Sequence, residues 1–292
     1  MNSAAILGAT SMLGKRLAAI LAQEGIPVTT CGRQANSDIM VDLIEGIKTD
    51  VPNNLRINTL FNCAASFCDD SWEGCRKNDL INAFGCHWAV ELAVKLGCRH
   101  VVNAGSLSSV PGVEEQAMGS YGFSKARGED ILEWGLSRSG ILFTSVRFPQ
   151  LFDEYGECCR HQPWFGRIVA YAAAGKDLRL PKSAGARNFV HVSDAARMLM
   201  AASRLGVCGR MNVAHFESLT YERIALMAYC VFKNGGKINE AAEKAPFRKV
   251  NFPSGENAFA ALKYRPAISM LQGLTMIKDH NTQGNFGPMD VE

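Results

Sequence analysis

The chain has 292 residues, of which 47% are hydrophobic and 20% charged, values typical of compact globular proteins. Its 31 basic and 28 acidic residues leave a net charge of +3 and form no run of five like charges, which argues against a nucleic-acid-binding arm or a membrane-surface patch. The N-terminal segment lacks the basic region of a secretory signal, and no apolar stretch reaches the roughly 18 residues of a membrane span, so we expect a cytoplasmic protein.

The ten cysteines are expected to be free thiols, because a chain of this length without a secretory signal rarely carries a disulfide framework. Cys158 and Cys159 lie near His161 and offer potential metal ligands. No second cluster completes a four-ligand site, so we predict no bound metal.

Strand-like runs alternate with longer helical patterns in the first half of the chain. Strands are predicted at 4–8, 27–31, 58–63, 100–104 and 142–147. Helices are predicted at 13–24, 77–96 and 124–137, with Gly25, Gly97 and Gly140 placed to end them. This alternation predicts an α/β fold with a doubly wound parallel sheet of the Rossmann type.

The alternation loosens after about residue 148, which predicts a second, smaller lobe. We expect a dinucleotide-binding domain formed by 1–150 with 189–215. The remaining segments, 151–188 with 216–292, are expected to form a C-terminal substrate-binding lobe, since specificity resides in divergent loops.

Residues 6–14, ILGATSMLG, join the first predicted strand to the first helix. Gly8 and Gly14 stand where a dinucleotide fingerprint needs a tight turn and close packing of helix on sheet, and the free amides at the helix start attract a pyrophosphate. Ser11 replaces the usual middle glycine, and its hydroxyl is small enough to bond a phosphate oxygen. A purely structural turn with two glycines is the alternative.

Gly32 and Arg33 follow the second strand, about where NAD-binding folds carry an acidic residue for the ribose hydroxyls. A guanidinium there can pair bidentately with a 2′-phosphate. Arg33 therefore favours NADP(H), with NAD(H) as the open alternative. A solvated surface arginine is the competing interpretation.

The stretch YGFSK, residues 121–125, places Tyr121 and Lys125 four residues apart, on one face of a helix. A nearby ammonium group favours ionisation of a phenol, which suits a general acid or base. Ser106, at the end of the strand-like run before it, offers a hydroxyl to a substrate carbonyl. An exposed tyrosine and lysine on a surface helix would give the same spacing.

Taken with the fingerprint, Ser106 and YGFSK, several further segments resemble those of the extended short-chain dehydrogenase/reductases, the NAD-dependent epimerase/dehydratase family acting mainly on nucleotide sugars. The similar segments are FNCAAS at 61–66, INAFGCHWAVELA at 81–93, VRFPQLFD at 146–153 and RNFVHVSDAA at 187–196. The resemblance covers nearly the whole chain. Asn188 departs from the usual aspartate, and the residues after Ser106 lack the acidic pair of dehydratases.

The resemblance implies roles for individual residues. It implies catalytic roles for Ser106, Tyr121, Lys125 and Asn82, and substrate contacts for Ser106, Gln150 and Arg187, the last of these on a diphosphate. It implies cofactor contacts for Gly8, Thr10, Ser11, Met12, Leu13, Gly14, Arg33, Asp42, Leu43, Cys63, Ala64, Ala65, Tyr121, Lys125 and Phe148. For Asp42, an exposed carboxylate at a strand end is the alternative.

Three functions follow as hypotheses. The first is an NADPH-dependent reductase of a keto group on a nucleotide-activated sugar, of the 4-keto-sugar reductase type. The second is a nucleotide-sugar epimerase with tightly held NAD, and the third is a non-catalytic dinucleotide-binding regulator. The resemblance also implies a homodimer, with Phe84, Trp88 and Leu92 either forming an apolar interface or belonging to the core.

Overall fold

The computed structural model describes residues 1–52, 54–114, 118–182 and 185–289, and the chain divides into two compact units. Unit 1 comprises Met1–Phe148, Ala195–Val213 and Pro253–Arg265, and unit 2 comprises Pro149–Asp194, Ala214–Phe252 and Pro266–Glu292. The sequence analysis expected 253–265 in the second lobe, but they join unit 1 because helix α8 (Glu256–Leu262) contacts strand β11 (Gly209–Asn212). It expected 189–194 and 214–215 in the first domain, and they belong to unit 2.

Unit 1 is built around an eight-stranded sheet in the order β11-β7-β6-β5-β1-β2-β3-β4. Neighbouring strands in this sheet run parallel, except for the antiparallel edge pair β3–β4. Besides β11, the strands are β1 (Ala4–Leu7), β2 (Val28–Gly32), β3 (Ile39–Asp42), β4 (Gly46–Ile47), β5 (Thr59–Asn62), β6 (His100–Ser106) and β7 (Leu142–Phe148).

The strand order reverses direction between β1 and β5. The chain starts at β1, moves outward through β2 and β3, and returns to β5 before continuing to the opposite edge. This is the doubly wound arrangement that the sequence predicts, and ligands bind such sheets beyond the carboxyl ends of the strands at the reversal. A ligand is therefore expected beyond the carboxyl ends of β1 and β5.

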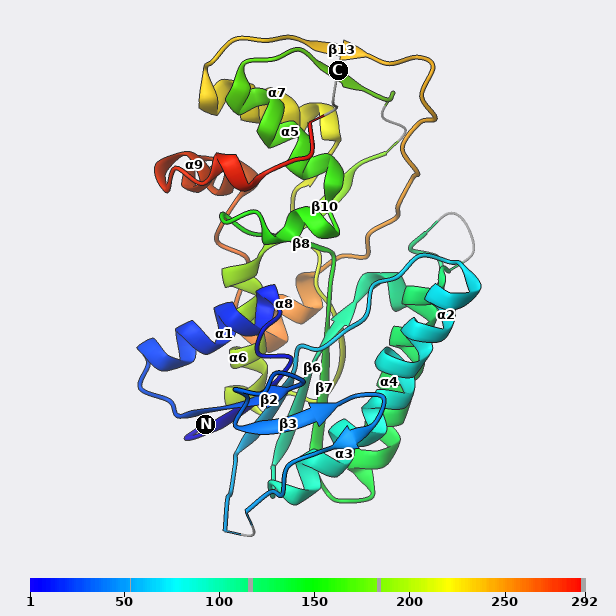
Figure 1. The fold of residues 1–292 in the computed structure, drawn as a ribbon, viewed down its shortest axis with the longest axis vertical. Helices are drawn as coiled ribbons and strands as arrows, with labels where there is room; N and C mark the ends of the chain where they lie inside the picture. The colour runs from blue at the N-terminus through cyan, green and yellow to red at the C-terminus, as the bar shows by residue number, and fades with distance from the viewer. Residues whose placement is uncertain (53, 115–117, 183–184, 290–292) are drawn as a thin grey trace. The chain divides into compact units, whose positions relative to one another are not determined.

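Helices cover both faces of this sheet (Figure 1). On one face lie α2 (Trp72–Asn78), the π-helical segment η1 (Asp79–Phe84), α3 (Gly85–Lys95) and α4 (Ser120–Ser137). On the other lie α1 (Met12–Gln23) and α6 (Val192–Leu205), which an ion pair between Glu24 and Arg204 joins. The core under α3 and α4 consists of side chains such as Leu7, Leu92 and Leu132, each at most 1% exposed.

A line of buried polar side chains also crosses this sheet. Asn62, Asn103 and Ser145 are cross-strand partners on β5, β6 and β7. Asn62 Nδ2 donates to Asn103 Oδ1 (2.9 Å), Asn103 Nδ2 to Ser145 Oγ (3.0 Å), and Ser145 Oγ to Glu129 Oε1 (2.6 Å). Glu129, on α4, is fully buried and also pairs with Arg147. We call Asn62, Asn103, Ser145 and Glu129 the polar ladder.

The described part of unit 2 contains two small sheets, three helices and the first residues of α6. The sheets have the orders β12-β10-β8 and β13-β9. The strands are β8 (Gln150–Phe152), β9 (Leu178–Leu180), β10 (Arg187–His191), β12 (Ser218–Leu219) and β13 (Ile238–Glu240), and the helices are α5 (Pro163–Ala174), α7 (Tyr221–Phe232) and α9 (Met270–Asp279). Short 3₁₀ turns occur at η2 (Leu107–Ser109) in unit 1 and at η3 (Glu157–Arg160) and η4 (Gln283–Asn285) in unit 2.

The five predicted strands and three predicted helices all occur, with shifted ends. The helix expected at 77–96 begins at Trp72 and is interrupted by η1. The glycines expected to end helices do so with positive φ, at Gly25 (70°), Gly97 (62°) and Gly140 (64°). The hairpin β3–β4 was missed, because strands of four and two residues give too short a pattern to detect.

Candidate active site

The turn between β1 and α1 has the geometry of a phosphate-binding cradle. Gly8 has φ +82°, and a Cβ on it would lie 2.7 Å from the backbone of Ala64. A Cβ on Gly14 would lie 2.3 Å from the carbonyl oxygen of Gly8. Both glycines are therefore required for the close approach of turn, helix and neighbouring strand end. The N–H groups of Met12 and Leu13, at the start of α1, have no intrahelical acceptor and suit an anion.

The Ser11 hydroxyl is hydrogen-bonded within the protein, and its predicted cofactor contact stays a prediction. Its hydroxyl accepts from Gly14 N (3.0 Å) and donates to the carbonyl of Cys63 (3.2 Å). The side chain therefore caps α1 and ties it to the end of β5. Thr10, which is exposed, is the hydroxyl residue of this turn that remains open to solvent.

The segment after β5 lies against the cradle, as the resemblance implies. Cys63 N donates to the carbonyl of Leu7 (2.8 Å), which extends the pairing of β1 with β5. Cys63 is buried, Ala64 touches Gly8, and Ala65 is exposed. Burial raises the pKa of the Cys63 thiol to about 12, so this cysteine is an inert part of the wall.

Arg33 lies just beyond the end of β2. It is exposed, and it forms no ion pair within the described part of the chain. The nearest carboxylate in sequence, Asp38, accepts from both the N–H and the hydroxyl of Thr30 (2.7 and 2.8 Å). These hydrogen bonds hold the pKa of Asp38 below its usual value. The guanidinium of Arg33 is thus available to an external anion.

Asp42 and Leu43 form the turn between β3 and β4. Asp42 Oδ1 accepts from the N–H groups of Ile44 (2.7 Å) and Glu45 (3.2 Å). Leu43 packs against the start of α3, where a Cβ on Gly85 would lie 2.7 Å from the Leu43 Cβ. One oxygen of Asp42 therefore stabilises the turn, and its predicted adenine contact stays a prediction.

Two contacts set the register of α4 against the end of β6. Lys125 Nζ donates to the carbonyl of Ala104 (2.8 Å). One turn earlier, a Cβ on Gly122 would lie 2.1 Å from the carbonyl of Ser108. These contacts bracket Ser106 and place it opposite the first turn of α4, which carries Tyr121. The ends of β6 and α4 that carry Ser106, Tyr121 and Lys125 therefore lie side by side, and the catalytic roles of these residues stay predictions.

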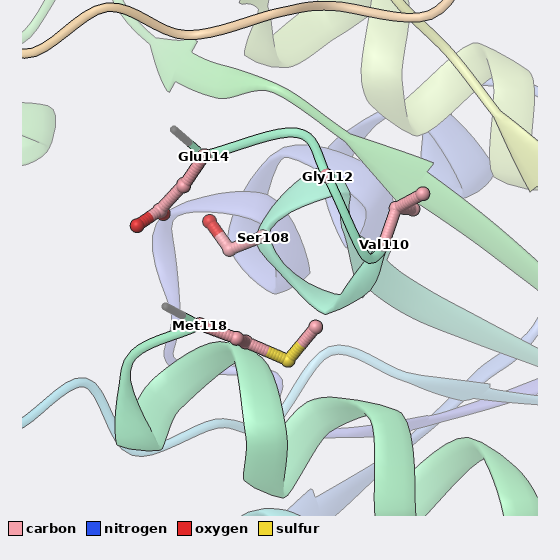
Figure 2. Close-up of a pocket in the computed structure, with 5 residues that line it drawn as sticks. All are labelled: Ser108, Val110, Gly112, Glu114 and Met118. Atoms are coloured by element: carbon pink, nitrogen blue, oxygen red, sulfur yellow. The ribbon is translucent and has the colours of Figure 1, made fainter. Parts of the chain in front are cut away.

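The Ser106 hydroxyl is oriented by its own loop. Its oxygen accepts from Ser108 N (3.2 Å), which leaves its proton free to donate to a ligand oxygen. Phe148, the last residue of β7, pairs with Ser106 and is buried. Figure 2 shows a small hollow between this loop and the start of α4, lined by Ser108, Val110, Gly112, Glu114 and Met118.

Asn82 is engaged in structural hydrogen bonds. Its Oδ1 accepts from Ser66 N (2.7 Å), and its Nδ2 donates to Ser66 O (2.8 Å) and Ser124 Oγ (3.1 Å). The side chain is 5% exposed. These bonds hold the loop after β5 against α4, and the catalytic role expected for Asn82 from the sequence stays a prediction.

Phe67 is a site residue that sequence reasoning missed. Its ring centroid lies 4.5 Å from that of Tyr121, at an interplanar angle of 63°. A single aromatic residue in a loop has no periodicity to reveal it. The one available signal was its place in the sequence, in the stretch SFCDD directly after the paired alanines.

Within unit 2, Arg187 and Gln150 gather around Tyr221. The Arg187 guanidinium lies 5.7 Å from the centre of the Tyr221 ring, and Nη1 donates to the carbonyls of Ala186 (3.1 Å) and Arg248 (2.5 Å). Burial raises the pKa of Tyr221, while hydrogen bonds from Gln150 and Arg187 act in the opposite direction. The Nε and Nη2 donors of Arg187 have the fork geometry that suits a phosphate.

Asn188 departs from the family pattern for a visible reason. Its Nδ2 donates to His215 O (2.8 Å) and Ser218 Oγ (3.0 Å), and its Oδ1 accepts from His215 N (2.7 Å). An ionised aspartate cannot donate to a carbonyl. The amide therefore fastens β10 to His215 and to the first residue of β12.

The described residues hold no group of three or more His, Cys, Asp or Glu side chains suited to a metal ion, and all ten cysteines are free. In the described part of the chain, no helix combines the length and apolar character needed to cross a membrane.

Comparison with known proteins agrees with this geometry. The model of the NAD dependent epimerase/dehydratase family matches residues 4–214. The curated proteins give no match.

Solved structures share the fold over nearly their whole length. UDP-N-acetylglucosamine 4-epimerase from Bacillus cereus is 18% identical, with 100% of this chain and 99% of that chain covered and a TM-score of 0.75. UDP-glucose 4-epimerase from Thermotoga maritima, solved with UDP-glucose, is 16% identical (97% and 99% covered, TM-score 0.77). RMD from Pseudomonas aeruginosa, complexed with NADPH, is 18% identical (97% and 100% covered, TM-score 0.77).

The family match extends over more than half of the chain and includes the cradle, Ser106, Tyr121 and Lys125. The doubly wound sheet and the structural neighbours point the same way. The chain therefore belongs to the NAD-dependent epimerase/dehydratase family, the extended short-chain dehydrogenase/reductase enzymes.

Proposed function

We propose that this protein is an NADPH-dependent reductase of a keto group on a nucleotide-activated sugar. The observation that carries the proposal is Arg33, an exposed and unpaired guanidinium, within the described residues, at the end of β2. Net reduction of a sugar draws on NADPH, and an arginine at this position favours the 2′-phosphate that distinguishes it.

The residues present fit a dinucleotide. Gly8 and Gly14 leave room that a Cβ would fill, and the amides of Met12 and Leu13 suit the pyrophosphate. The cofactor would supply a hydride. Lys125, held at the carbonyl of Ala104, would bind its ribose, and the remaining contacts implied by the resemblance would complete the cofactor site.

The chain itself would supply the proton. Tyr121 would donate its phenolic proton to the substrate oxygen as the hydride arrives at the carbon. Ser106 would donate a hydrogen bond to the same oxygen and stabilise its developing negative charge. In unit 2, Arg187 would bind the diphosphate of the nucleotide sugar, and Gln150, which bonds Tyr221 beside it, would line that site.

A nucleotide-sugar epimerase is the second candidate. Two of the similar structures are 4-epimerases of UDP-sugars. The same Tyr121 and Ser106 would then take the proton in the oxidation half-reaction and return it in the reduction half-reaction. This candidate needs a tightly held NAD, which the availability of Arg33 to a 2′-phosphate disfavours.

The test is turnover by the purified protein. With NADPH and a nucleoside-diphosphate 4-keto sugar, we expect consumption of NADPH and one equivalent of the 4-hydroxy sugar. Tyr121→Phe removes the proton donor, and Tyr155→Phe, which removes a phenolic hydroxyl from unit 2, is the matched control. Inversion of a UDP-sugar without consumption of NADPH would support the epimerase instead.

We also propose a homodimer formed through the face of η1 and α4. Phe84 (47%) and Trp134 (60%) are exposed there, and large aromatic side chains are enriched in protein–protein interfaces. The sequence analysis grouped Phe84 with Trp88 and Leu92. Leu92 is fully buried in the core, and the Trp88 ring lies against Gly46. Analytical ultracentrifugation of the wild type and of Phe84→Glu tests the proposed dimer. The wild type should sediment as a dimer and the variant as a monomer.

A further inference from the structure

Two buried asparagines hold the loop that follows β5. Asn82 pairs with the N–H and carbonyl of Ser66, as described above. Asn78 pairs in the same way with Cys68: its Oδ1 accepts from Cys68 N (3.0 Å) and its Nδ2 donates to Cys68 O (3.1 Å). We call these two pairs the amide clasps. Each carboxamide satisfies both the N–H and the carbonyl of one loop residue, as a neighbouring strand would in a sheet.

Both clasps extend to the first turns of α4. Asn78 Nδ2 donates to Ser120 Oγ (2.9 Å), and Asn82 Nδ2 donates to Ser124 Oγ (3.1 Å). Asp70, in the same loop, accepts from Ser120 N (2.7 Å). The loop is thus fastened on either side of Tyr121, and the fastening residues are four apart on both helical segments, as side chains on one face must be.

Phe67 lies between the two clasped residues. Successive side chains of an extended segment point to opposite sides, so clasping Ser66 and Cys68 fixes the direction of Phe67 between them. Its ring meets the Tyr121 ring edge to face at 4.5 Å, yet the side chain remains 53% exposed. A half-exposed ring gains little from burial, so its contact with the Tyr121 ring contributes to holding it in place.

We propose that Phe67 is a positioning residue for Tyr121, and that the amide clasps of Asn78 and Asn82 hold Phe67 in place. The inference rests on the proposed function for its catalytic consequence. The phenolic oxygen must stay within hydrogen-bond reach of the substrate oxygen. The Phe67 ring, in contact with the Tyr121 ring, limits the orientations that the phenol can adopt.

The first experiment reads the position of the Tyr121 ring without any substrate. The six tyrosines are labelled as 3-fluorotyrosine, and the Tyr121 fluorine resonance is assigned by its loss in Tyr121→Phe. Phe67→Ala should shift and broaden this resonance, because the ring current and the steric wall of Phe67 are lost. Phe123→Ala is the matched control: Phe123 is also 53% exposed, and its ring contacts the Arg127 guanidinium. An unchanged resonance in Phe67→Ala would overturn the proposal.

The clasps are tested in the same spectrum. Asn78→Leu should move the resonance as Phe67→Ala does. Since Asn78 is fully buried and this variant can fail to fold, Ser120→Ala, which removes one partner of the clasp, serves beside it with a smaller shift in the same direction. A folded Asn78→Leu or Ser120→Ala with the wild-type resonance would overturn the role of that clasp.

The second experiment measures turnover. If the wild type reduces a nucleotide keto-sugar, Phe67→Ala should lower kcat about tenfold with KM within about twofold, the size of an aromatic pair and of a modest misplacement. Phe67→Tyr, which keeps a ring, should restore most of kcat. A raised KM with unchanged kcat would make Phe67 a substrate contact and overturn the positioning role. Absence of wild-type turnover would count against the proposed function alone, because the fluorine spectrum decides the positioning independently.

Discussion

Replacing Arg33 with alanine tests the cofactor preference directly. Arg33 is exposed and makes no ion pair among the described residues, so its guanidinium has no internal partner to give up on binding. A charge-assisted pair with a 2′-phosphate contributes about 1.5 to 3 kcal/mol. This corresponds to about a ten- to a hundred-fold preference for NADPH over NADH. Because the site is exposed, salt should move the value toward the lower end of that range.

The assay is titration of NADPH and NADH by fluorescence at low and at physiological salt. Arg33→Ala should weaken NADPH binding by that factor and leave NADH binding unchanged, so that most of the preference disappears. Arg99→Ala is the matched control, since Arg99 is an exposed arginine just before β6, at the opposite end of the strands from the cradle. Equal affinities in the wild type, or a preference for NADH, would refute the interpretation of Arg33 and favour the epimerase.

Three further predictions concern catalysis, substrate binding and acid stability. Tyr121→Phe should lower kcat by about 10² or more with cofactor affinity nearly unchanged; kinetics with the cognate substrate check this, and near-normal turnover would remove Tyr121 from the mechanism. Arg187→Ala should raise KM for a nucleotide sugar several-fold, and an unchanged KM in a folded variant would show that the diphosphate binds elsewhere. Burial lowers the pKa of His100 from 6.5 to about 4, so the unfolded chain binds a proton that the folded chain does not. The free energy of unfolding should therefore fall as the pH drops from 6.5 to 4, by about 3 kcal/mol from this residue. Urea unfolding across that range, with His100→Gln as the reference, should show a shallower dependence in the variant.

The parts of the fold that depend on local pattern could be predicted from the sequence. The Gly8 and Gly14 turn, the central strands and the YGFSK helix each combine an apolar run with a capping or turn residue, and the structure has them all. The π-helical turn at Asp79–Phe84 could not be predicted, because the sequence pattern of 77–96 is that of one continuous helix.

The same limit applies to the site. Tyr121 and Lys125 share one helix, and their spacing is visible in the sequence. The bond of Ser11 to Cys63, the clasping role of Asn82 and the contact of Phe67 with Tyr121 all join separate segments. Such contacts follow from tertiary packing, which no window of sequence contains. In unit 2 the strands have only two to five residues, so periodicity had little to act on.

The polar ladder fixes the register of the three central strands. Strands β5, β6 and β7 are buried on both faces, so their apolar residues alone would tolerate sliding by one position. Sliding β6 by one residue would turn Asn103 to the other face and take away the shared partner of Asn62 and Ser145. Sliding β7 would separate Glu129 from Ser145 and Arg147. The buried Glu129 carboxylate would then be unpaired, at a cost of about 3–5 kcal/mol. Each shifted register is thus less stable than the native one, and the polar ladder selects a single register for the three middle strands.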